Sequence, residues 1–357
     1  MMDNLNSSTG LRILIVTDAW RQINGVVTTL ENLNRTLTDM GHDVDFLNYD
    51  DAEYTCGMPF YPEIKLAYVK QYVIKRKVDW ADAVHIATPE GPIGFKTLRY
   101  CVKNKIPFTT GYHTKWPEFV RARLPVPTSI TYAYMRWLHK QSKSILVPTQ
   151  TVVEELGSKG FNNLCVWTRG VERSIFNSSL RTKLNCGRPL LLCVTRVSHE
   201  KGLDDFCKLD YPGATKIIVG DGPYRKELEA KYPDVIFAGI KTGNSLAKFY
   251  ANADVFVFPS KSDTFGVVMI ESMACGTPVA AYPVTGPTDV IEQGVTGYMH
   301  NDLVTAIDNC LELDREQVHY NSLKWTWLNC ATQFLISLII IEKQLPKNAA
   351  PQQNLHK

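Results

Sequence analysis

The sequence lacks the features that mark several large classes of protein. Its 39 Lys and Arg residues face 36 Asp and Glu, and a net charge of +3 argues against a dedicated nucleic-acid binder. No run reaches the roughly 20 apolar residues that a membrane-spanning helix needs. The polar residues 1–12 contain no apolar core of a signal peptide. We therefore expect a cytoplasmic globular protein without a nucleic-acid partner.

The cysteine pattern also excludes some functions. The nine cysteines contain no Cys-x-x-Cys pair and no Cys/His spacing typical of a zinc site, and their number is odd. This pattern favours a reducing compartment and free thiols over a disulfide framework. The sequence predicts neither a structural metal nor an essential cofactor.

The 357 residues are sufficient for two domains with separate cores. Short apolar runs alternate with amphipathic segments, which is typical of parallel sheets covered by helices. Strands are expected at 11–18, 42–47, 79–86, 107–113 and 144–148, then at 188–194, 215–220, 235–239, 254–258 and 279–282. Helices are expected at 24–41, 149–157, 224–231 and 267–274, and around 325–334, and the apolar run 334–341 is interpreted as a core helix.

One stretch, residues 253–282, organises the rest of the chain. It predicts a strand, a polar loop, a helix from Val267 to Ala274 that ends before Gly276, and a second strand. Asp263 precedes the helix and Glu271 lies within it, about 6 Å along the axis from the helix start. Two acids at different depths suit two parts of one elongated ligand better than acid and base catalysis at one carbon.

This stretch resembles the signature of retaining glycosyltransferase family 4, which has the GT-B fold. The family pattern is Glu, Gly, Phe, Gly, four residues, Glu, Ala, then Ala and Gly. Here it occurs as Asp263, Thr264, Phe265, Gly266, Glu271, Ser272, Ala274 and Gly276. Asp-Thr-Phe-Gly resembles the variant of mannosyltransferase-like and sulfolipid-synthase-like branches. The resemblance extends over about residues 11–340.

The resemblance implies roles for individual residues. Glu271 would hold the ribose of a nucleotide sugar, Asp263 the sugar hydroxyls, and Arg196 with Lys201 the diphosphate, although surface ion pairing is the plainer interpretation of the two cations. His113 and Gly25 would face the donor from the other domain. Further donor-binding residues are the turn Gly220, Asp221 and Gly222 and the helix start Phe265, Gly266 and Val267, where free backbone N–H groups can receive an anion.

The expected architecture is α/β: two doubly wound Rossmann-like domains that face a cleft. The expected division is residues 1–168 on the acceptor side and 169–320 for the nucleotide sugar. A helix within 321–345 would return to the first domain, and 346–357 would form a polar tail. The expected reaction is hexose transfer with retention from a GDP-sugar or UDP-sugar. The alternatives are a nucleotide-sugar 2-epimerase of the same fold and a non-catalytic nucleotide-sugar-binding module.

Asp43 and Asp45 imitate the Asp-x-Asp metal motif of another glycosyltransferase fold. They lie in an early predicted strand, remote from the donor motifs, so we interpret them as structural. Turnover without a divalent ion is expected, because two fixed cations can neutralise the diphosphate.

The first domain contains a basic region that bears on the acceptor. Between residues 65 and 143 only Asp79, Asp82, Glu90 and Glu118 oppose fifteen cations, and aromatic residues are interleaved with the later cations. A solvated basic face is one interpretation. The other is contact with an anionic membrane and a lipid or lipid-linked glycan acceptor, and a soluble glycan stays open. Glu90 is a candidate acceptor contact.

Overall fold

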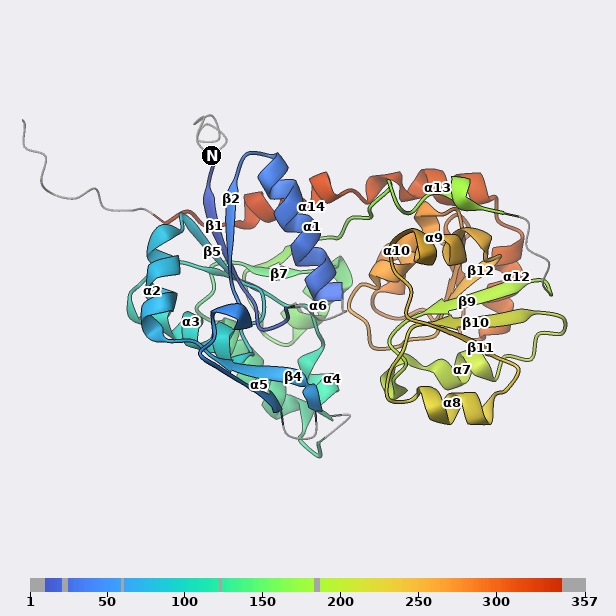
Figure 1. Cartoon of the computed structure of the whole chain (residues 1–357), viewed down its shortest axis with the longest axis horizontal. Helices are drawn as coiled ribbons and strands as arrows, with labels where there is room; N and C mark the ends of the chain where they lie inside the picture. Colours follow the sequence, from blue (N-terminus) through green and yellow to red (C-terminus); the bar gives the residue numbers. More distant parts are fainter. Residues whose placement is uncertain (1–9, 21–24, 59–60, 122–123, 183–186, 342–357) are drawn as a thin grey trace, which may run out of the picture.

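The computed structural model describes residues 10–20, 25–58, 61–121, 124–182 and 187–341, with the side chains of 58–66 left out. Two lobes lie side by side, one built from the first half of the chain and one from the second (Figure 1). Asn24 and the expected tail at 346–357 lie outside the described residues.

The first domain contains a six-stranded parallel sheet in the order β2-β1-β5-β6-β7-β8. Its strands are β1 (Arg12–Val16), β2 (Asp43–Leu47), β5 (Ala83–Ile86), β6 (Thr109–Gly111), β7 (Ile145–Val147) and β8 (Leu164–Val166). Its helices are α1 (Gly25–Asp39), α2 (Gln71–Trp80), α3 (Pro92–Lys103), α4 (Trp116–Arg121), α5 (Thr128–His139) and α6 (Gln150–Ser158), with the 3-10 turn η1 (Tyr49–Asp51).

The second domain repeats this plan in the order β11-β10-β9-β12-β13-β14. Its strands are β9 (Leu190–Val194), β10 (Thr215–Val219), β11 (Ile236–Gly239), β12 (Val255–Phe258), β13 (Val279–Ala281) and β14 (Gly297–Met299). Its helices are α7 (Leu203–Cys207), α8 (Arg225–Lys231), α9 (Gly243–Asn252), α10 (Val267–Ala274), α11 (Pro287–Val290), α12 (Leu303–Leu311) and α13 (Arg315–Asn321), with the 3-10 turns η2 (Ser178–Leu180), η3 (His199–Lys201) and η4 (Ser322–Lys324).

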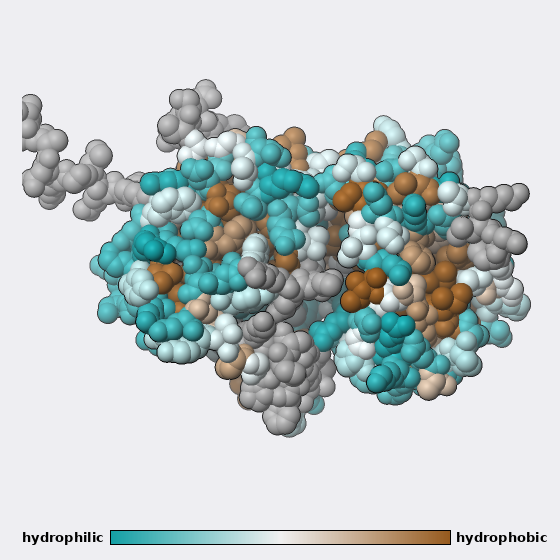
Figure 2. Space-filling model, viewed as in Figure 1, coloured by the Kyte–Doolittle hydropathy of each residue, from teal (hydrophilic) through white to brown (hydrophobic). Residues whose placement is uncertain are grey.

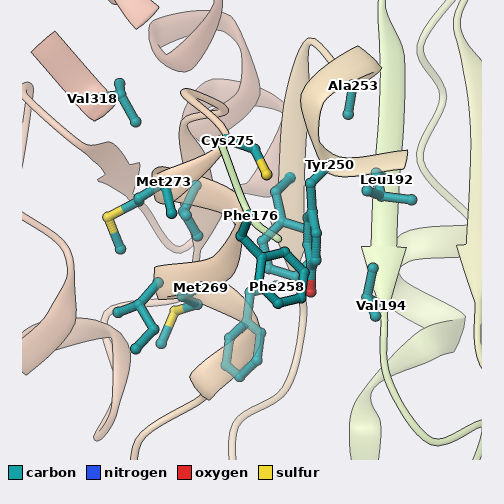
Figure 3. Packing of buried hydrophobic residues seen from close by; sticks show 14 of the residues in the cluster. Phe176, Leu192, Val194, Tyr250, Ala253, Phe258, Met269, Met273, Cys275 and Val318 are labelled. Carbon is teal, nitrogen blue, oxygen red and sulfur yellow. The ribbon is translucent and has the colours of Figure 1, made fainter. Parts of the chain in front are cut away.

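The strands are apolar throughout because both faces of each sheet are covered. On β9, Leu190, Leu192 and Val194 pack into one cluster, whereas Leu191 and Cys193 pack into another on the opposite face. Successive side chains of a strand point to opposite faces, so a sheet buried on both sides leaves no polar alternation in its sequence. Figure 3 shows the first of these clusters, where Phe258 and Met269 meet between the sheet and α10.

The C-terminal helix α14 (Trp327–Ser337) returns to the first domain, where it lies beside α1 (Figure 1). Trp327 and Phe334 are buried together with Ile13 of β1. The expected fold class, two doubly wound domains with a returning helix, is confirmed.

Three local expectations were wrong or incomplete. The helix expected over 334–341 ends at Ser337, since Ile340 pairs antiparallel with Ala83 and the Ile341 N–H donates to the Asp82 carbonyl at 2.7 Å. The strand expected from residue 79 starts only at Ala83, because α2 continues to Trp80. The antiparallel hairpin of β3 (Tyr54–Met58) and β4 (Tyr61–Tyr68) was not predicted.

Candidate active site

The charged site residues of the second domain meet at the centre of its sheet. There β9 lies between β10 and β12, so the order of the strands reverses at this point. Open α/β sheets bind ligands at such a switch point, beyond the carboxyl ends of the strands. Arg196 and Lys201 follow β9, and Asp263 follows β12. The fold therefore brings together Lys201 and Asp263, which lie 62 positions apart in the sequence, and Arg196 lies on the same loop as Lys201.

Lys201 and Asp263 form an ion pair in which Nζ lies 2.6 Å from Oδ1. About four fifths of each side chain is shielded from solvent, with exposed fractions of 21% and 23%. Burial acts to raise the pKa of Asp263, but the Lys201 ammonium outweighs it and lowers that pKa below its usual range. Arg196 is exposed on the same loop. The site therefore presents the Lys201 ammonium against an ionised Asp263 carboxylate.

Glu271 lies one turn into α10 and faces Tyr250 of α9. The Tyr250 hydroxyl donates to Glu271 Oε2 at 2.9 Å, and Tyr250 itself is fully buried. Burial raises the pKa of Glu271 to about 7. The carboxyl group is therefore divided between its neutral and charged forms near neutral pH.

Two glycine-dependent loops meet beside the cations. The Val197 N–H donates to the Asp221 carbonyl at 3.0 Å, and the Tyr224 N–H donates to the Val197 carbonyl at 3.1 Å. A Cβ at Gly220, where φ is +139°, would lie 1.9 Å from the Thr195 carbonyl oxygen, and one at Gly222 would lie 2.3 Å from that of Val197. Neither position has room for a side chain. The Asp221 carboxylate pairs with Arg225 at 3.1 Å.

Gly266 caps α10 in the left-handed conformation, with φ +85°. A Cβ there would lie 2.7 Å from the movable Met269 methyl carbon, so it is the left-handed conformation that favours glycine. The Phe265 side chain is 4% exposed and packs edge-on against Trp325 at 5.4 Å between ring centroids. Phe265 can therefore reach a donor only with its backbone, and Val267 begins the helix at half-buried depth.

His113 follows β6 of the first domain and contacts the signature loop of the second. Its carbonyl oxygen accepts a hydrogen bond from Thr264 Oγ1 at 2.9 Å, which brings it next to Asp263. Its ring nitrogen Nδ1 lies 3.0 Å from Arg169 Nη2. Burial, and then the charge of Arg169, lower the pKa of His113 well below its usual value. The imidazole is therefore neutral.

Two further acids and a glycine lie at the carboxyl ends of strands in the first domain. Asp18, after β1, accepts hydrogen bonds from the Ile93 and Gly94 N–H groups at 3.0 Å each, and burial raises its pKa to about 6. Glu90 accepts from Trp116 Nε1 at 2.5 Å, and burial raises its pKa to about 7. Gly25 is the exposed first residue of α1, with open space where a side chain would be.

The structure thus joins Lys201 with Asp263, and His113 with the loop that carries Asp263. Sequence reasoning missed Arg169, Tyr250 and Asp18. Asp18 follows the first strand directly, and the rule that ligands bind at carboxyl ends of strands could have identified it. Arg169 and Tyr250 gave no such signal, because their partners lie 56 and 21 residues away and are brought near only by the fold.

Comparison with protein families covers both domains. A family model described as Glycosyltransferase Family 4 matches residues 23–174, and one described as Glycosyl transferases group 1 matches residues 188–313. Together the two matches include most of the chain. The chain belongs to glycosyltransferase family 4. It is thus a glycosyltransferase of the expected family.

Relatives of this family 4 chain act on several sugars. The chain is 27% identical to the sulfoquinovosyl transferase SQD2 of Arabidopsis thaliana over 88% of its own length and 69% of that protein. It is 32% identical to a GDP-mannose-dependent alpha-mannosyltransferase of Mycobacterium tuberculosis over 61% of its length and 60% of that protein. It is 27% identical to an alpha-monoglucosyldiacylglycerol synthase of Streptococcus pneumoniae over 83% and 77%. These names agree with the branch that the Asp-Thr-Phe-Gly variant indicates.

Solved structures show the same fold. HepE from Anabaena, crystallised with UDP and glucose, matches with a TM-score of 0.68 and 18% identity over 92% of this chain and 99% of that one. A sucrose-phosphate synthase from Thermosynechococcus elongatus matches with a TM-score of 0.68 and 17% identity over 91% and 98%. The family 4 chain therefore has the expected GT-B architecture.

Two features of the described part of the family 4 chain bear on metals and membranes. Within the described ranges, no cluster of three or more His, Cys, Asp or Glu residues could hold a metal ion. Asp45 pairs instead with Lys77 at 3.2 Å, and Asp43 is exposed on β2. Over the same part of the chain, no helix is long and apolar enough to cross a bilayer.

Proposed function

We propose that this chain transfers a hexose of mannose or glucose type from a nucleoside diphosphate sugar to a lipid or glycan acceptor, with retention of configuration. The observation that carries the proposal is the Lys201–Asp263 pair of 2.6 Å at the switch point of the second sheet, joined through Thr264 to His113 of the first domain. Charges suited to a diphosphate and to sugar hydroxyls thus lie at the junction of the two domains.

Each residue then has a part in binding the donor. Arg196 and Lys201 stabilise the negative charge that develops on the departing diphosphate, as fixed cations do in place of a metal. The Asp263 carboxylate accepts hydrogen bonds from the hexose, and Glu271 accepts them from the ribose. The close-packed turn at Gly220 to Gly222 borders the nucleotide, and Gly25 leaves room for the diphosphate at the start of α1.

The names of the relatives support a hexose as the transferred sugar. They do not decide whether the donor carries guanine or uracil. The mannosyltransferases are described as GDP-mannose-dependent, whereas HepE was crystallised with UDP and glucose. The two donor classes share the diphosphate and the ribose, which are the parts assigned to Lys201 and Glu271. The donor class is therefore a question for experiment.

The first domain supports a lipid acceptor. A groove of about 900 Å³ lies between α2, α3 and α5, and Lys96, Arg99, Lys103 and Lys140 line it together with Phe95 and Trp137. Cations around an apolar floor suit an anionic amphiphile. The visible face in Figure 2 is mostly hydrophilic, with its apolar residues in small separate patches. We propose a peripheral position at an anionic membrane surface.

The donor is tested with a panel that includes GDP-mannose, GDP-glucose, UDP-glucose and UDP-galactose. The true donor at 100 times its dissociation constant should add roughly 2.7 kcal/mol to the free energy of unfolding, seen as a rise in Tm. Transfer to glycolipid or glycan acceptors, with the anomeric configuration of the product read by NMR, tests the reaction. A rearranged nucleotide sugar without acceptor would indicate an epimerase, and binding without turnover a non-catalytic module.

The same assay tests whether a metal is needed. Turnover should persist after treatment with a chelator, because Arg196 and Lys201 supply the positive charge. Activity that disappears with chelator and returns with magnesium or manganese would contradict this proposal. Variants of Asp43 and Asp45 would then be the next to measure.

A further inference from the structure

Arg169 is buried, and yet it has no acidic partner. It is 5% exposed, and in the described part of the chain no carboxylate forms an ion pair with it. Its Nη1 donates to the carbonyl oxygens of Trp167 at 2.6 Å and Thr168 at 3.1 Å, and its guanidinium lies 4.6 Å from the Trp167 ring centroid. Burial lowers its pKa to about 10, which leaves it charged at neutral pH. A buried cation without a counter-ion destabilises the fold, so it calls for an explanation.

The remaining contact of Arg169 is with His113, and it determines the state of that ring. A guanidinium can only donate hydrogen bonds. His113 Nδ1, 3.0 Å from Arg169 Nη2, must therefore be an acceptor, and the single ring proton of the neutral imidazole lies on Nε2. A doubly protonated ring would place N–H against N–H and positive charge beside positive charge.

The position of the His113 ring is fixed on its other sides as well. A Cβ on Gly111 would lie 2.5 Å from His113 Nε2, so the ring can lie over this strand end only because residue 111 is glycine. Trp167 packs against the ring in a T-shaped arrangement at 5.7 Å. Nε2 has no hydrogen-bond partner among the described residues. The ring therefore retains a donor that nothing in the described chain uses.

We propose that Arg169 is a positioning residue that holds His113 as the neutral Nε2–H tautomer, so that Nε2–H donates to an oxygen of the bound hexose. The inference rests on the proposed function, in which His113 faces the transferred sugar. The inference goes beyond that function, because Arg169 has no part in the donor binding described above. Burial, together with the charge of Arg169, keeps the ring unprotonated at pH values where an ordinary histidine titrates, about 6.5.

The test compares Arg169→Leu, Arg169→Gln and wild type. Leucine removes both the donor and the charge, whereas glutamine keeps a donor for Nδ1. We expect Arg169→Leu to lower kcat by about 10-fold, with the Kd of free nucleotide within twofold of wild type. Because burial still lowers the pKa of His113 and only the Arg169 charge is lost, the acid limb of the kcat pH profile should move to higher pH than in wild type. Arg169→Gln should recover most of the kcat that Arg169→Leu loses.

Arg315 offers a matched control in the second domain. It is also held by carbonyls, with Nη1 2.7 Å from the Ala253 oxygen and Nη2 3.0 Å from that of Ala251, and burial lowers its pKa to about 10 as well. No histidine among the described residues forms a hydrogen bond with it. Arg315→Leu should lower Tm without moving the acid limb of the kcat pH profile. The same shift of the acid limb in both variants would mean that it reflects instability, and would overturn the proposal.

A second measurement does not depend on turnover or on the Arg169 and Arg315 variants folding. In ¹⁵N-labelled wild-type protein, the His113 signals, identified by their loss in His113→Gln, should show an unprotonated Nδ1 and a protonated Nε2 that do not titrate between pH 5.5 and 8. The opposite tautomer, or titration near pH 6.5, would overturn the proposal. Absence of transfer with every donor would count against the proposed function, while this spectrum would still decide the role of Arg169.

Discussion

Asp263 and Glu271 lie in different electrostatic surroundings, and this difference determines how their variants should behave. Asp263 is held charged by Lys201, whereas Glu271 faces the buried Tyr250 hydroxyl. We expect Glu271→Ala to weaken binding of free nucleotide by roughly 10- to 100-fold, the worth of a hydrogen bond to a charged group. Asp263→Ala should leave nucleotide affinity near wild type and lower sugar transfer.

Calorimetric titration with GDP and UDP, together with kcat for transfer, separates the two effects. Glu271→Gln and Asp263→Asn serve as controls of similar shape. If both alanine variants bind free nucleotide as wild type does, the two acids have been given the wrong roles.

The raised pKa of Glu271 predicts a pH dependence. Because its folded pKa of about 7 lies above the ordinary 4.5, the folded state binds the extra proton, and the associated stability is lost as pH rises from about 4.5 through 7. Wild type should therefore lose stability relative to Glu271→Gln over this window. Nucleotide affinity should change in the opposite sense, rising as the carboxylate forms.

Thermal melts of wild type and Glu271→Gln at half-unit intervals from pH 5 to 8, without and with nucleotide, check both trends. Parallel curves for the two proteins would show that Glu271 titrates at its ordinary pKa and that its burial has no electrostatic consequence.

At the scale of elements, two glycines of the candidate site differ in the space around them. A Cβ at Gly220 would lie 1.9 Å from a backbone oxygen, whereas one at Gly25 would meet nothing within 4 Å. Gly220→Ala should therefore displace the β10–α8 loop and lower both Tm and nucleotide affinity. Gly25→Ala should leave Tm unchanged or slightly higher, since alanine favours a helix by up to about 1 kcal/mol.

The diagnostic measurement is kcat/KM of Gly25→Ala, because its fold has room for the methyl group. A fall in kcat/KM at unchanged Tm would indicate that the ligand needs this space. Wild-type kinetics would remove Gly25 from the donor site.

The sequence predicted the elements whose signal is local. The runs at 190–194 and 255–258 are apolar because both faces are buried, and Gly266 marks the start of α10 by its left-handed backbone. Elements defined by distant partners were missed. Ile340 is extended because it pairs with Ala83, and nothing in the apolar run from residue 334 shows this. The contact of Arg169 with His113 likewise exists only in the folded chain.

For the whole molecule, the site depends on how the domains meet. Besides Thr264 and His113, Lys115 Nζ lies 3.1 Å from Thr285 Oγ1, and the Thr151 N–H donates to Asp289 Oδ1 at 2.9 Å. In each of these three contacts one residue belongs to the first domain and the other to the second. Neither domain therefore forms the complete site alone.

In the structure, fewer residues of the first domain are free to contact a membrane than the basic region in the sequence suggested. Several of its cations are paired, such as Lys115 with Glu155 at 2.7 Å, and Tyr132 is 6% exposed. Arg123 and the Lys65 side chain lie outside the description. Two aromatic side chains of α5 stack on each other and face solvent: Trp137 is 57% exposed and Tyr134 is 46% exposed. Three exposed cations, Arg99, Lys103 and Lys140, line the groove that Trp137 also lines.

These residues predict salt-sensitive binding to anionic vesicles. Each basic residue near such a surface is worth about 1 kcal/mol, so Arg99→Gln, Lys103→Gln and Lys140→Gln together should weaken binding by roughly 100-fold, and Trp137→Ala should weaken it further because indole rings settle at the interface. Lys226→Gln, on α8 of the second domain, is the matched control and should bind as wild type does. Sedimentation with vesicles containing phosphatidylglycerol or phosphatidylcholine, at low and high salt, measures this. If the anionic vesicles sediment no more protein than the neutral ones, the acceptor is to be sought among soluble glycans.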